Sequence, residues 1–373
     1  MTHTARPAPP AAIPPGILCA ADYEALAVRH IDAPTLAYIA GGSGAETTLS
    51  ANLRAFAQWQ IRPRVLCDVS AGHTRVRVLG RAWAHPAMLA PVGWQRLVHP
   101  GGECDTARGA AAAGACFVAS TLASASLEAI AAAGEGEQWF QLYFQAQRSV
   151  TLDLVRRAEA AGYRALVVTL DAPVSSPGRR AQRAGFRVPD GVQAENLRRY
   201  RAPDLPALAP EQSRIFQGAM RAAPTWEDLH WLLTATTLPV VVKGVLSADD
   251  ACALRAAGVA ALVVSNHGGR ALDGVPPSLT ALREIRAALG AGYPLLFDSG
   301  IRSGDDIFKA LALGADAVMV GRLQAYALAV AGALGVAHML RLLCEELELC
   351  MALAGCATVA DIGAHCVSEA RPC

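Results

Sequence analysis

Eight short apolar runs recur along this chain, and each leads through small or polar residues into an Ala/Leu-rich stretch. Each run is too short for a helix and too continuously apolar for a half-exposed strand, which predicts a parallel sheet buried on both faces. The predicted strands are 87–91, 116–120, 139–143, 165–169, 239–243, 261–265, 294–298 and 317–321.

The stretches between these runs have apolar residues at helical spacing, for example 150–161, 248–257, 279–289 and 305–313. Gly162, Gly258 and Gly314 stand where such helices would end. Eight strand–helix units predict an α/β fold, a (β/α)8 or TIM barrel. A doubly wound sheet is the alternative, but it normally has fewer strands of this type. We expect an active-site loop with short elements of its own between Asp171 and Pro239, and a helical extension before about Ala84.

Composition agrees with a large buried core. The 373 residues are 53% hydrophobic and only 17% charged, which excludes a disordered chain. The formal charge of +1 gives no electrostatic footprint for nucleic acid or an anionic membrane. We predict a flexible Pro/Ala-rich tail over residues 1–20 and a single barrel domain over residues 21–373.

Cysteine usage and the N-terminus favour a soluble, cytoplasmic protein. The ten cysteines are dispersed, with no CxxC pair and no His/Cys cluster at zinc spacing, so we expect buried apolar thiols and no metal site. The first residues lack the apolar segment of a signal peptide. The charge-free stretch 109–127 is interrupted by Gly114, Ser120, Thr121 and Ser124, which argues against a membrane span.

Polar or small residues stand at the carboxyl ends of all eight predicted strands, where catalytic residues of such barrels lie. After strands 7 and 8 the chain offers two Gly/Arg pairs, Gly300 with Arg302 and Gly321 with Arg322. Glycines let backbone N–H groups approach an anion and Arg adds bidentate donors, which predicts a site for a phosphorylated cofactor or substrate. Alone, this pattern also fits a sugar-phosphate enzyme.

The segment 265–273 is the most informative, because His267 at a strand end precedes Arg270 in a Gly-rich loop. This spacing places a general base beside a carboxylate-binding cation. Asp171, at the end of strand 4, is expected to face His267 and favour its protonated form. Lys243 ends an otherwise apolar strand and should balance a negative charge, although a Schiff-base lysine stays open. Tyr143 and Tyr38 are candidate phenolic donors.

These residues resemble the FMN-dependent 2-hydroxy-acid oxidases and dehydrogenases, a family that includes glycolate oxidase, lactate oxidase and mandelate dehydrogenase. The likeness runs from about Tyr23 to Ile362. It is carried by an ordered series of motifs at 62–69, 99–103, 141–143, 242–244, 265–270, 298–302, 309–315 and 351–356.

The resemblance implies a role for each matching residue. His267 would be the catalytic base, paired with Asp171, and Arg270, Tyr143 and Tyr38 would bind substrate. Lys243 would stabilise negative charge on the reduced flavin. The remaining positions would hold FMN: Pro91, Val92, Gly93, Ser120, Gln141, Thr169, Lys243 and Ser265 around the flavin, and Asp298, Ser299, Gly300, Ile301, Arg302, Gly321 and Arg322 around the ribityl chain and phosphate.

The chain also departs from the family pattern. The second substrate arginine expected after strand 4 falls on Gly178 by ungapped counting; Arg179 or Arg180 could replace it, and we favour Arg180. Leu122 and Val92 stand where glycolate oxidase has Trp and Thr, which predicts a wider pocket and a side chain larger than that of glycolate.

The activity implied is oxidation of an (S)-2-hydroxy acid, lactate- or mandelate-like, to the 2-oxo acid, with O2 as acceptor and H2O2 as product. A dehydrogenase using a quinone or another acceptor, or an impaired flavin-binding protein, are the alternatives. Family members commonly assemble as homotetramers or octamers, and the sequence carries no motif that reports assembly.

Overall fold

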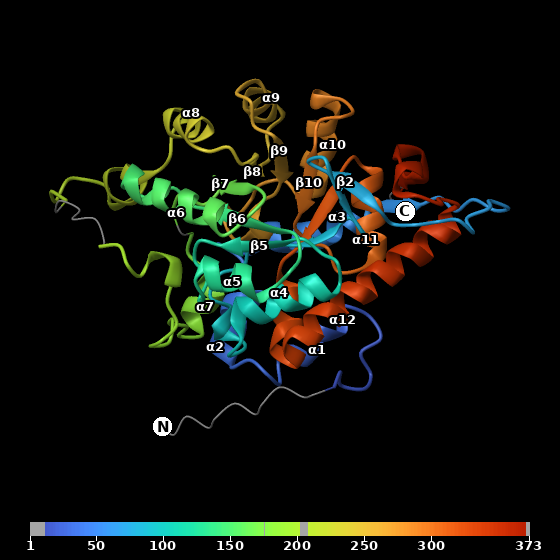
Figure 1. Ribbon diagram of the computed structural model, residues 1–373, viewed down its shortest axis with the longest axis horizontal. Coiled ribbons are helices and arrows are strands. Elements are labelled where there is room, and N and C mark those ends of the chain that lie inside the picture. Colours follow the sequence, from blue (N-terminus) through green and yellow to red (C-terminus); the bar gives the residue numbers. More distant parts are fainter. Residues whose placement is uncertain (1–11, 175, 202–207, 371–373) are drawn as a thin grey trace.

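The computed structural model describes residues 12–174, 176–201 and 208–370. Eight parallel strands form a closed barrel in the order β10-β11-β4-β5-β6-β7-β8-β9. Figure 1 labels β5 to β10 of this ring. They match the eight predicted strands to within two residues at each end: β4 Ala87–Leu89, β5 Phe117–Ser120, β6 Gln138–Leu142, β7 Leu166–Thr169, β8 Val240–Val245, β9 Ala261–Val264, β10 Leu295–Asp298 and β11 Ala317–Val320.

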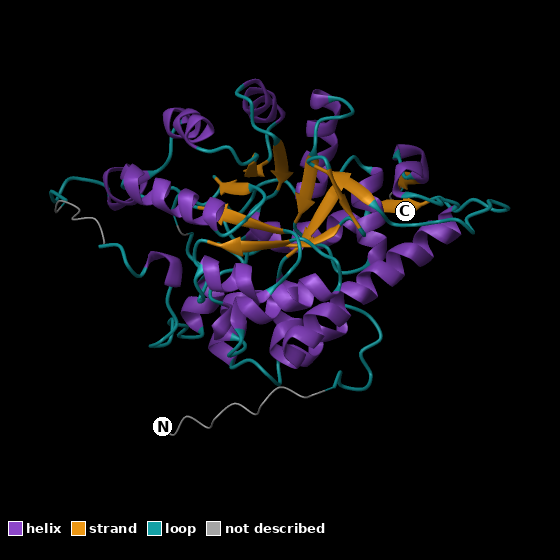
Figure 2. Ribbon diagram, viewed as in Figure 1, coloured by secondary structure: helices purple, strands orange, loops and turns teal. Residues whose placement is uncertain are grey.

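Helices surround this ring of strands (Figure 2). The four helices that the sequence analysis bounds are confirmed, and every end differs by at most two residues: α6 Arg148–Ala160, α9 Ala248–Ala256, α10 Ser278–Leu289 and α11 Gly304–Ala312. The layer is completed by α4 Gly102–Ala112, α5 Leu127–Ala133, α8 Trp226–Ala235 and α12 Arg322–Ala354. The predicted (β/α)8 barrel is therefore confirmed, and the doubly wound alternative is wrong.

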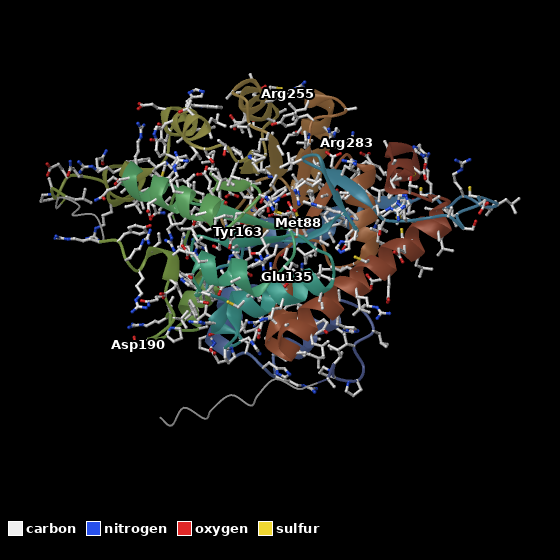
Figure 3. All side chains as sticks on the ribbon, in the orientation of Figure 1. Met88, Glu135, Tyr163, Asp190, Arg255 and Arg283 are labelled. Atoms are coloured by element: carbon white, nitrogen blue, oxygen red, sulfur yellow. The ribbon has the colours of Figure 1, made fainter. Side chains whose placement is uncertain are left out.

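Alternate residues of each strand serve two separate cores, because successive side chains of a strand point to opposite faces. On β8, Val240 and Val242 pack outward against helices, whereas Val241 packs inside the barrel. Met88 of β4 is fully buried in the inner core and lies near the middle of the view in Figure 3, whereas Asp190 of the long loop lies at the outer edge. Burial on both faces explains the continuously apolar runs.

The chain before Ala84 is helical only in part, which corrects the predicted helical extension. Three helices come first, α1 Asp22–Ala27, α2 Ala33–Ala40 and α3 Thr47–Ala57. They are followed by β1 Trp59–Ile61, which pairs antiparallel with β12 Val367–Glu369, and by the hairpin of β2 Val76–Val78 and β3 Arg81–Trp83. Val78 and Trp83 join the inner core, so the hairpin adds to the packing inside the barrel.

The predicted boundary between tail and barrel also moves. Most of the expected flexible tail, residues 1–11, lies outside the described residues. Ile17 and Ala20, however, are buried members of the outer core. The packed part of the chain therefore begins before residue 21.

The connection from β7 to β8 contains short elements, as predicted, and one full helix that was not predicted. The short elements are α7 Arg179–Arg183 and single turns at Glu195–Leu197, Arg214–Gly218 and Ala219–Ala222. The full helix is α8, which begins at a capping box in which Thr225 and Asp228 exchange hydrogen bonds. This helix completes the fourth strand–helix unit.

Within the described chain, α12 is the one helix long and apolar enough to cross a membrane by length and composition. Most of its apolar window, 61%, is buried inside the fold, as in the core helix of a globular protein. The backbone at Ala331 and Gly332 also leaves helical geometry, so two shorter helices meet there at a kink. The evidence for a membrane span is weak.

Candidate active site

At the carboxyl ends of six neighbouring strands the inward-facing position changes from apolar to polar. The side chains are buried; five lie in β5, β6, β7, β8 and β10, and Ser265 directly follows β9: Ser120, Gln141, Thr169, Lys243, Ser265 and Asp298. On one side, Ser120 Oγ donates to Gln141 Oε1 at 3.2 Å, and Gln141 Nε2 donates to Thr169 Oγ1 at 3.1 Å. Together these residues form a polar layer above the apolar inner core.

Lys243 is the charged centre of this polar layer. Its Nζ lies 2.8 Å from Asp298 Oδ2 and donates to Ser265 Oγ at 2.7 Å. Burial lowers the pKa of Lys243, but the carboxylates of Asp298 and Asp171 outweigh that effect and raise it above the ordinary value. Lys243 is therefore a buried ammonium ion at neutral pH, which makes it unsuited to forming a Schiff base.

A cavity opens directly above the polar layer. Tyr38, Tyr143, Lys243, His267 and Arg270 all line it, which brings five predicted catalytic and substrate residues together. The predicted cofactor residues in its wall are Pro91, Val92, Gly93, Ser120, Asp298, Ser299, Gly300, Ile301, Arg302, Gly321 and Arg322. Gln141, Thr169 and Ser265 are not in this lining and belong to the polar layer beneath.

His267 is held against Asp171, as predicted. His267 Nδ1 lies 2.9 Å from Asp171 Oδ1. Because a carboxylate only accepts, Nδ1 is assigned as the donor, which leaves Nε2 as the basic nitrogen. Burial raises the pKa of Asp171, but the charge and hydrogen bond of His267, together with Lys243, hold it below its usual value. Asp171 is thus an anion held against the imidazole of His267.

Gly244 is required for this pairing. Its φ is +104°, and a Cβ added there would lie 2.5 Å from both Cβ and Cγ of Asp171. The ladder between β8 and β9 shifts register between Lys243 and Val245. A bulge at a glycine therefore lets Asp171 approach the strand end.

Arg270 lines the same cavity, and its Nη1 donates to the carbonyl oxygens of Tyr38 at 2.7 Å, Gly41 at 3.0 Å and Ile39 at 3.2 Å. Its guanidinium carbon lies 4.8 Å from the centre of the Tyr38 ring. Tyr38 in turn stacks on Phe186 with ring centroids 4.3 Å apart. The long loop thus supplies the outer layer of an Arg–Tyr–Phe stack.

Positive charge is concentrated at the predicted phosphate site, next to Arg270, because Arg322 shares the carbonyl acceptors Ile39 and Gly41 with it. Arg322 donates to the carbonyl oxygens of Ile39, Gly268 and Gly41. Burial, with the charges of Arg270 and Arg302, lowers the pKa of Arg322 to about 9. Arg302 Nε pairs with Glu24 at 2.9 Å. A site that gathers three guanidinium groups is stabilised by a bound anion.

Backbone strain is concentrated in the walls of this cavity. Of the six non-glycine residues with positive φ in the described chain, Trp94, His267 and Ser299 all line it. Such conformations cost of order 1–3 kcal/mol each and persist where the surroundings determine them. Sequence patterns do not reveal this strain.

The structure does not support the assignment of Arg180 to the substrate. Arg180 is half-exposed, pairs with Glu46 and is not part of the cavity lining. Its neighbour Arg179 begins the short helix α7. Arg180 nevertheless lies close to the chain that Arg270 contacts. A Cβ added to Gly41 would lie 3.6 Å from Cβ of Arg180, and Arg270 donates to the Gly41 carbonyl oxygen.

Two aromatic residues of the site, Trp94 and Phe186, were not predicted from the sequence. Trp94 lines the cavity beside Leu122 and lies 6.2 Å from Tyr38 between ring centres, so an aromatic wall accompanies the position that Leu122 leaves open. Extending the strand-end search by two residues beyond Val92 would have found Trp94. Phe186 had no such signal, because it lies deep in the long loop.

Glu103 fixes the two loops that carry Trp94 and Leu122. It is fully buried, and its carboxylate accepts from the backbone N–H of Gln95 and Ser124, each at 2.9 Å, and from Ser124 Oγ at 2.6 Å. The loops after β4 and β5 are thereby joined through one side chain. Among the described residues, no group of three or more His, Cys, Asp or Glu side chains could hold a metal ion.

Comparison with known proteins agrees with this geometry. The model of the FMN-dependent dehydrogenase family matches residues 27–369. The chain belongs to this family. It is 60% identical to an L-lactate oxidase of Alicycliphilus denitrificans, over 94% of this chain and 96% of that protein. It is 44% identical to a 4-hydroxymandelate oxidase of Amycolatopsis orientalis, over 91% and 95%.

A solved structure of a mandelate oxidase with (S)-2-phenylpropionate has a TM-score of 0.85 and 42% identity to the chain, covering 95% of this chain and 98% of that one. The predicted family, barrel fold, FMN cofactor and enzyme class are thus confirmed. The chemistry of the chain is the FMN-dependent oxidation of 2-hydroxy acids.

The residues of the site fit FMN. A flat ring with hydrogen-bonding edges suits the polar layer, and the buried Lys243 ammonium suits the negative charge that a reduced flavin carries. Arg302 and Arg322, with Gly300 and Gly321, fit the phosphate, since a bound anion would stabilise the buried Arg322 guanidinium beside its cationic neighbours. These residues would hold FMN across the cavity, with His267 and Arg270 beside it.

Proposed function

We propose that the enzyme oxidises an (S)-2-hydroxy acid with a lactate- or mandelate-like side chain to the 2-oxo acid and passes the electrons to O2, giving H2O2. The observation that carries this proposal is the placement of His267 and Arg270 in one cavity with the Lys243–Asp298 pair. The names of the relatives, an L-lactate oxidase and a 4-hydroxymandelate oxidase, support the substrate class and the acceptor.

Arg270 binds the substrate carboxylate. The three backbone hydrogen bonds that it donates all come from Nη1, which leaves Nη2 and Nε for a bidentate contact. Its stacking on Tyr38 holds the guanidinium plane, so the group is oriented before substrate arrives. Tyr38 and Tyr143 add phenolic donors from the cavity wall.

His267 removes a proton at Nε2. Asp171 accepts from Nδ1, fixes the tautomer and stabilises the imidazolium that forms. The proton comes either from C2 or from the 2-hydroxyl group, and both routes use the same nitrogen. Burial, together with the charges of Asp171 and Tyr38, raises the pKa of Tyr143 above its usual value, so Tyr143 remains a neutral donor throughout.

Bound FMN would accept the two electrons that leave C2 in either route. Lys243 provides the compensating positive charge, and its contacts with Asp298 and Ser265 keep the ammonium group in the barrel rather than in solvent. The walls of the cavity exclude water from this charge pair, which strengthens it.

The substrate side chain is placed between Leu122 and Trp94. Leu122 leaves room that a large aromatic residue would fill, and the Trp94 ring offers an aromatic surface on the same side of the cavity. This arrangement favours a methyl or a phenyl side chain over the single hydrogen of glycolate, because apolar area is buried against both residues.

The test is an anaerobic screen of L-lactate, (S)-mandelate and glycolate against the purified holoenzyme. We expect the flavin absorbance to bleach with L-lactate or (S)-mandelate faster than with glycolate, and one H2O2 to form per 2-oxo acid in air. Turnover with a dye but no peroxide in air would favour a different electron acceptor. An unchanged oxidised spectrum with every acid would contradict the proposed activity.

We also propose a cytoplasmic homotetramer. All nine cysteines in the described part of the chain are free, which suits a reducing compartment. Leu349 and Leu353, four residues apart on α12, are 62% and 64% exposed, and such an apolar pair suits contact with another copy. Light scattering of the holoenzyme would give the mass directly, and a monomer would contradict the assembly.

A further inference from the structure

The sequence predicts buried, apolar thiols, but the placement of the cysteines in the structure suggests chemistry for two of them. Four of the nine described are buried: Cys116, Cys350, Cys356 and Cys366. Two of these, Cys356 and Cys366, meet in the outer core, outside the ring of strands. Cys356 follows the end of α12, and Cys366 directly precedes β12, the strand that pairs with β1.

The thiols of Cys356 and Cys366 are in contact. The two sulfur atoms lie 3.7 Å apart, and the side chains are in residues only 4% and 2% exposed. Both thiols point at one acceptor, since each Sγ lies 3.7 Å from the carbonyl oxygen of Asp361. A disulfide has a sulfur–sulfur distance of about 2.05 Å, so the bond needs an approach of about 1.7 Å.

We propose that Cys356 and Cys366 form a peroxide-sensitive dithiol, in which Cys366 reacts with H2O2 and Cys356 closes a disulfide. This site is separate from the flavin cavity, whose lining contains neither cysteine. The identity of the oxidant in the cell rests on the proposed function, which generates H2O2. The reaction of the two thiols with added peroxide is independent of that function.

His365 activates Cys366. Its Nε2 lies 3.3 Å from Cys366 Sγ, and the imidazole is at the exposed surface. The imidazole can take the thiol proton and leave a thiolate, which is the nucleophile in thiol chemistry. Cys356 has no such partner, and burial with the neighbouring Cys366 thiol raises the pKa of Cys356 to about 12. Cys366 is therefore the attacking group.

Peroxide can reach this corner of the molecule. A cavity of about 840 Å³ at the base of the barrel is lined by the residues that flank Cys366 on both sides, Ile362, Gly363, Ala364 and Val367. Hydrogen peroxide is little larger than water, so we expect it to reach the buried Cys366 from this cavity through small movements of the flanking segment.

The reaction balances in two steps. The Cys366 thiolate attacks one oxygen of H2O2, the O–O bond breaks, and the proton held by His365 leaves with the departing oxygen as water. The product is a sulfenic acid at Cys366. Cys356 then attacks the Cys366 sulfur, the S–O bond breaks, and the oxygen leaves with the Cys356 proton as a second water. Two thiols are oxidised and one peroxide is reduced.

A competing thiol lies close by. A Cβ added to Gly355 would lie 2.7 Å from Sγ of Cys67, so Cys67 is near the chain just before Cys356. Cys67 donates instead toward the carbonyl oxygen of Val65 at 3.8 Å. A disulfide between Cys67 and Cys356 would thus be a different product, and peptide mapping separates the two.

The experiment treats reduced holoenzyme with equimolar H2O2 in the absence of substrate, followed by alkylation, intact mass and peptide mapping. We expect Cys356 and Cys366 to lose their free thiols together, with a mass decrease of about 2 Da that dithiothreitol reverses. Cys356→Ser should trap the Cys366 sulfenic acid as a dimedone adduct. His365→Gln should slow the reaction about tenfold, and Cys252→Ser, at an exposed site outside the pair, should not.

The proposal is overturned if both thiols stay alkylatable while Cys252 is oxidised, or if Cys356 pairs with Cys67. Equal rates in wild type and His365→Gln would overturn the role of His365. A second arm adds L-lactate in air, with and without catalase. If added peroxide forms the disulfide but turnover does not, the proposed oxygen reaction fails and the dithiol stands.

Discussion

The two ends of the barrel interior use the same strand positions for opposite purposes. Along β8, Val241 and Lys243 both point inward, yet the first packs in the apolar inner core and the second pairs with Asp298 in the polar layer. The same change occurs from Leu296 to Asp298 on β10. The strand period fixes the direction of a side chain, whereas its chemistry decides whether that end of the barrel is stable alone or suited to a ligand.

The largest effect is expected for His267→Gln at the polar end, on the rate of flavin reduction. Because the base is lost and glutamine cannot take a proton, flavin reduction by substrate should slow by about 10³-fold or more, or about 4 kcal/mol of barrier. Stopped-flow reduction under anaerobic conditions measures this step. Flavin content should stay near that of wild type, and a loss of less than tenfold would contradict the role of His267.

Lys243→Met tests the charge pair of the polar layer. Methionine matches the length of lysine, but it leaves the Asp298 carboxylate buried without its cation, which should cost about 3–4 kcal/mol of unfolding free energy. Urea denaturation of the apoprotein measures this cost, and flavin retention reports the site. The double variant with Asp298→Asn removes both charges and should recover part of the stability. No recovery would show that the unpaired Asp298 carboxylate does not cause the loss of stability in Lys243→Met.

Met88→Ala makes the matched change at the apolar end. Met88 is fully buried in the inner core, and truncation there should lower the free energy of unfolding by about 2–3 kcal/mol through lost contacts and a cavity. The rate of flavin reduction per folded molecule should be unchanged, since no polar group of the site moves. A tenfold slower rate would mean that the two ends are not separable.

The sequence predicts the strands of the barrel better than the loops around the site, and the reason is physical. Buried parallel strands have a local pattern, so the strand carrying Val241 and Lys243 was located to within two residues. Arg180 was assigned by position in a loop, where chain direction depends on contacts such as its ion pair with Glu46, and no local pattern encodes those. The roles of Phe186 and of the β2–β3 hairpin depend on long-range packing in the same way.

Substitution of Asp273 should have the smallest effect on stability, and it tests which contacts hold the polar end of the barrel in place. Its carboxylate accepts from the backbone N–H of Ala45 at 2.8 Å, the hydroxyl of Thr47 at 2.7 Å and the backbone N–H of Thr48 at 2.9 Å, which ties the Arg270 loop to the start of α3. These hydrogen bonds hold the pKa of Asp273 well below its usual value. Asp273→Ala should cost about 1 kcal/mol, the usual size of a lost cap.

The pH dependence of the stability difference between wild type and Asp273→Ala shows whether the charge of Asp273 causes it. A lowered folded-state pKa gives stability that is fully present above the unfolded pKa, about 3.9, and is lost as pH falls toward the folded value. Urea melts of wild type and Asp273→Ala should therefore differ by a constant amount from pH 7 to pH 5 and converge below about pH 4. A difference that persists in acid would come from packing of the side chain, and the tie between the Arg270 loop and α3 would not depend on the anion.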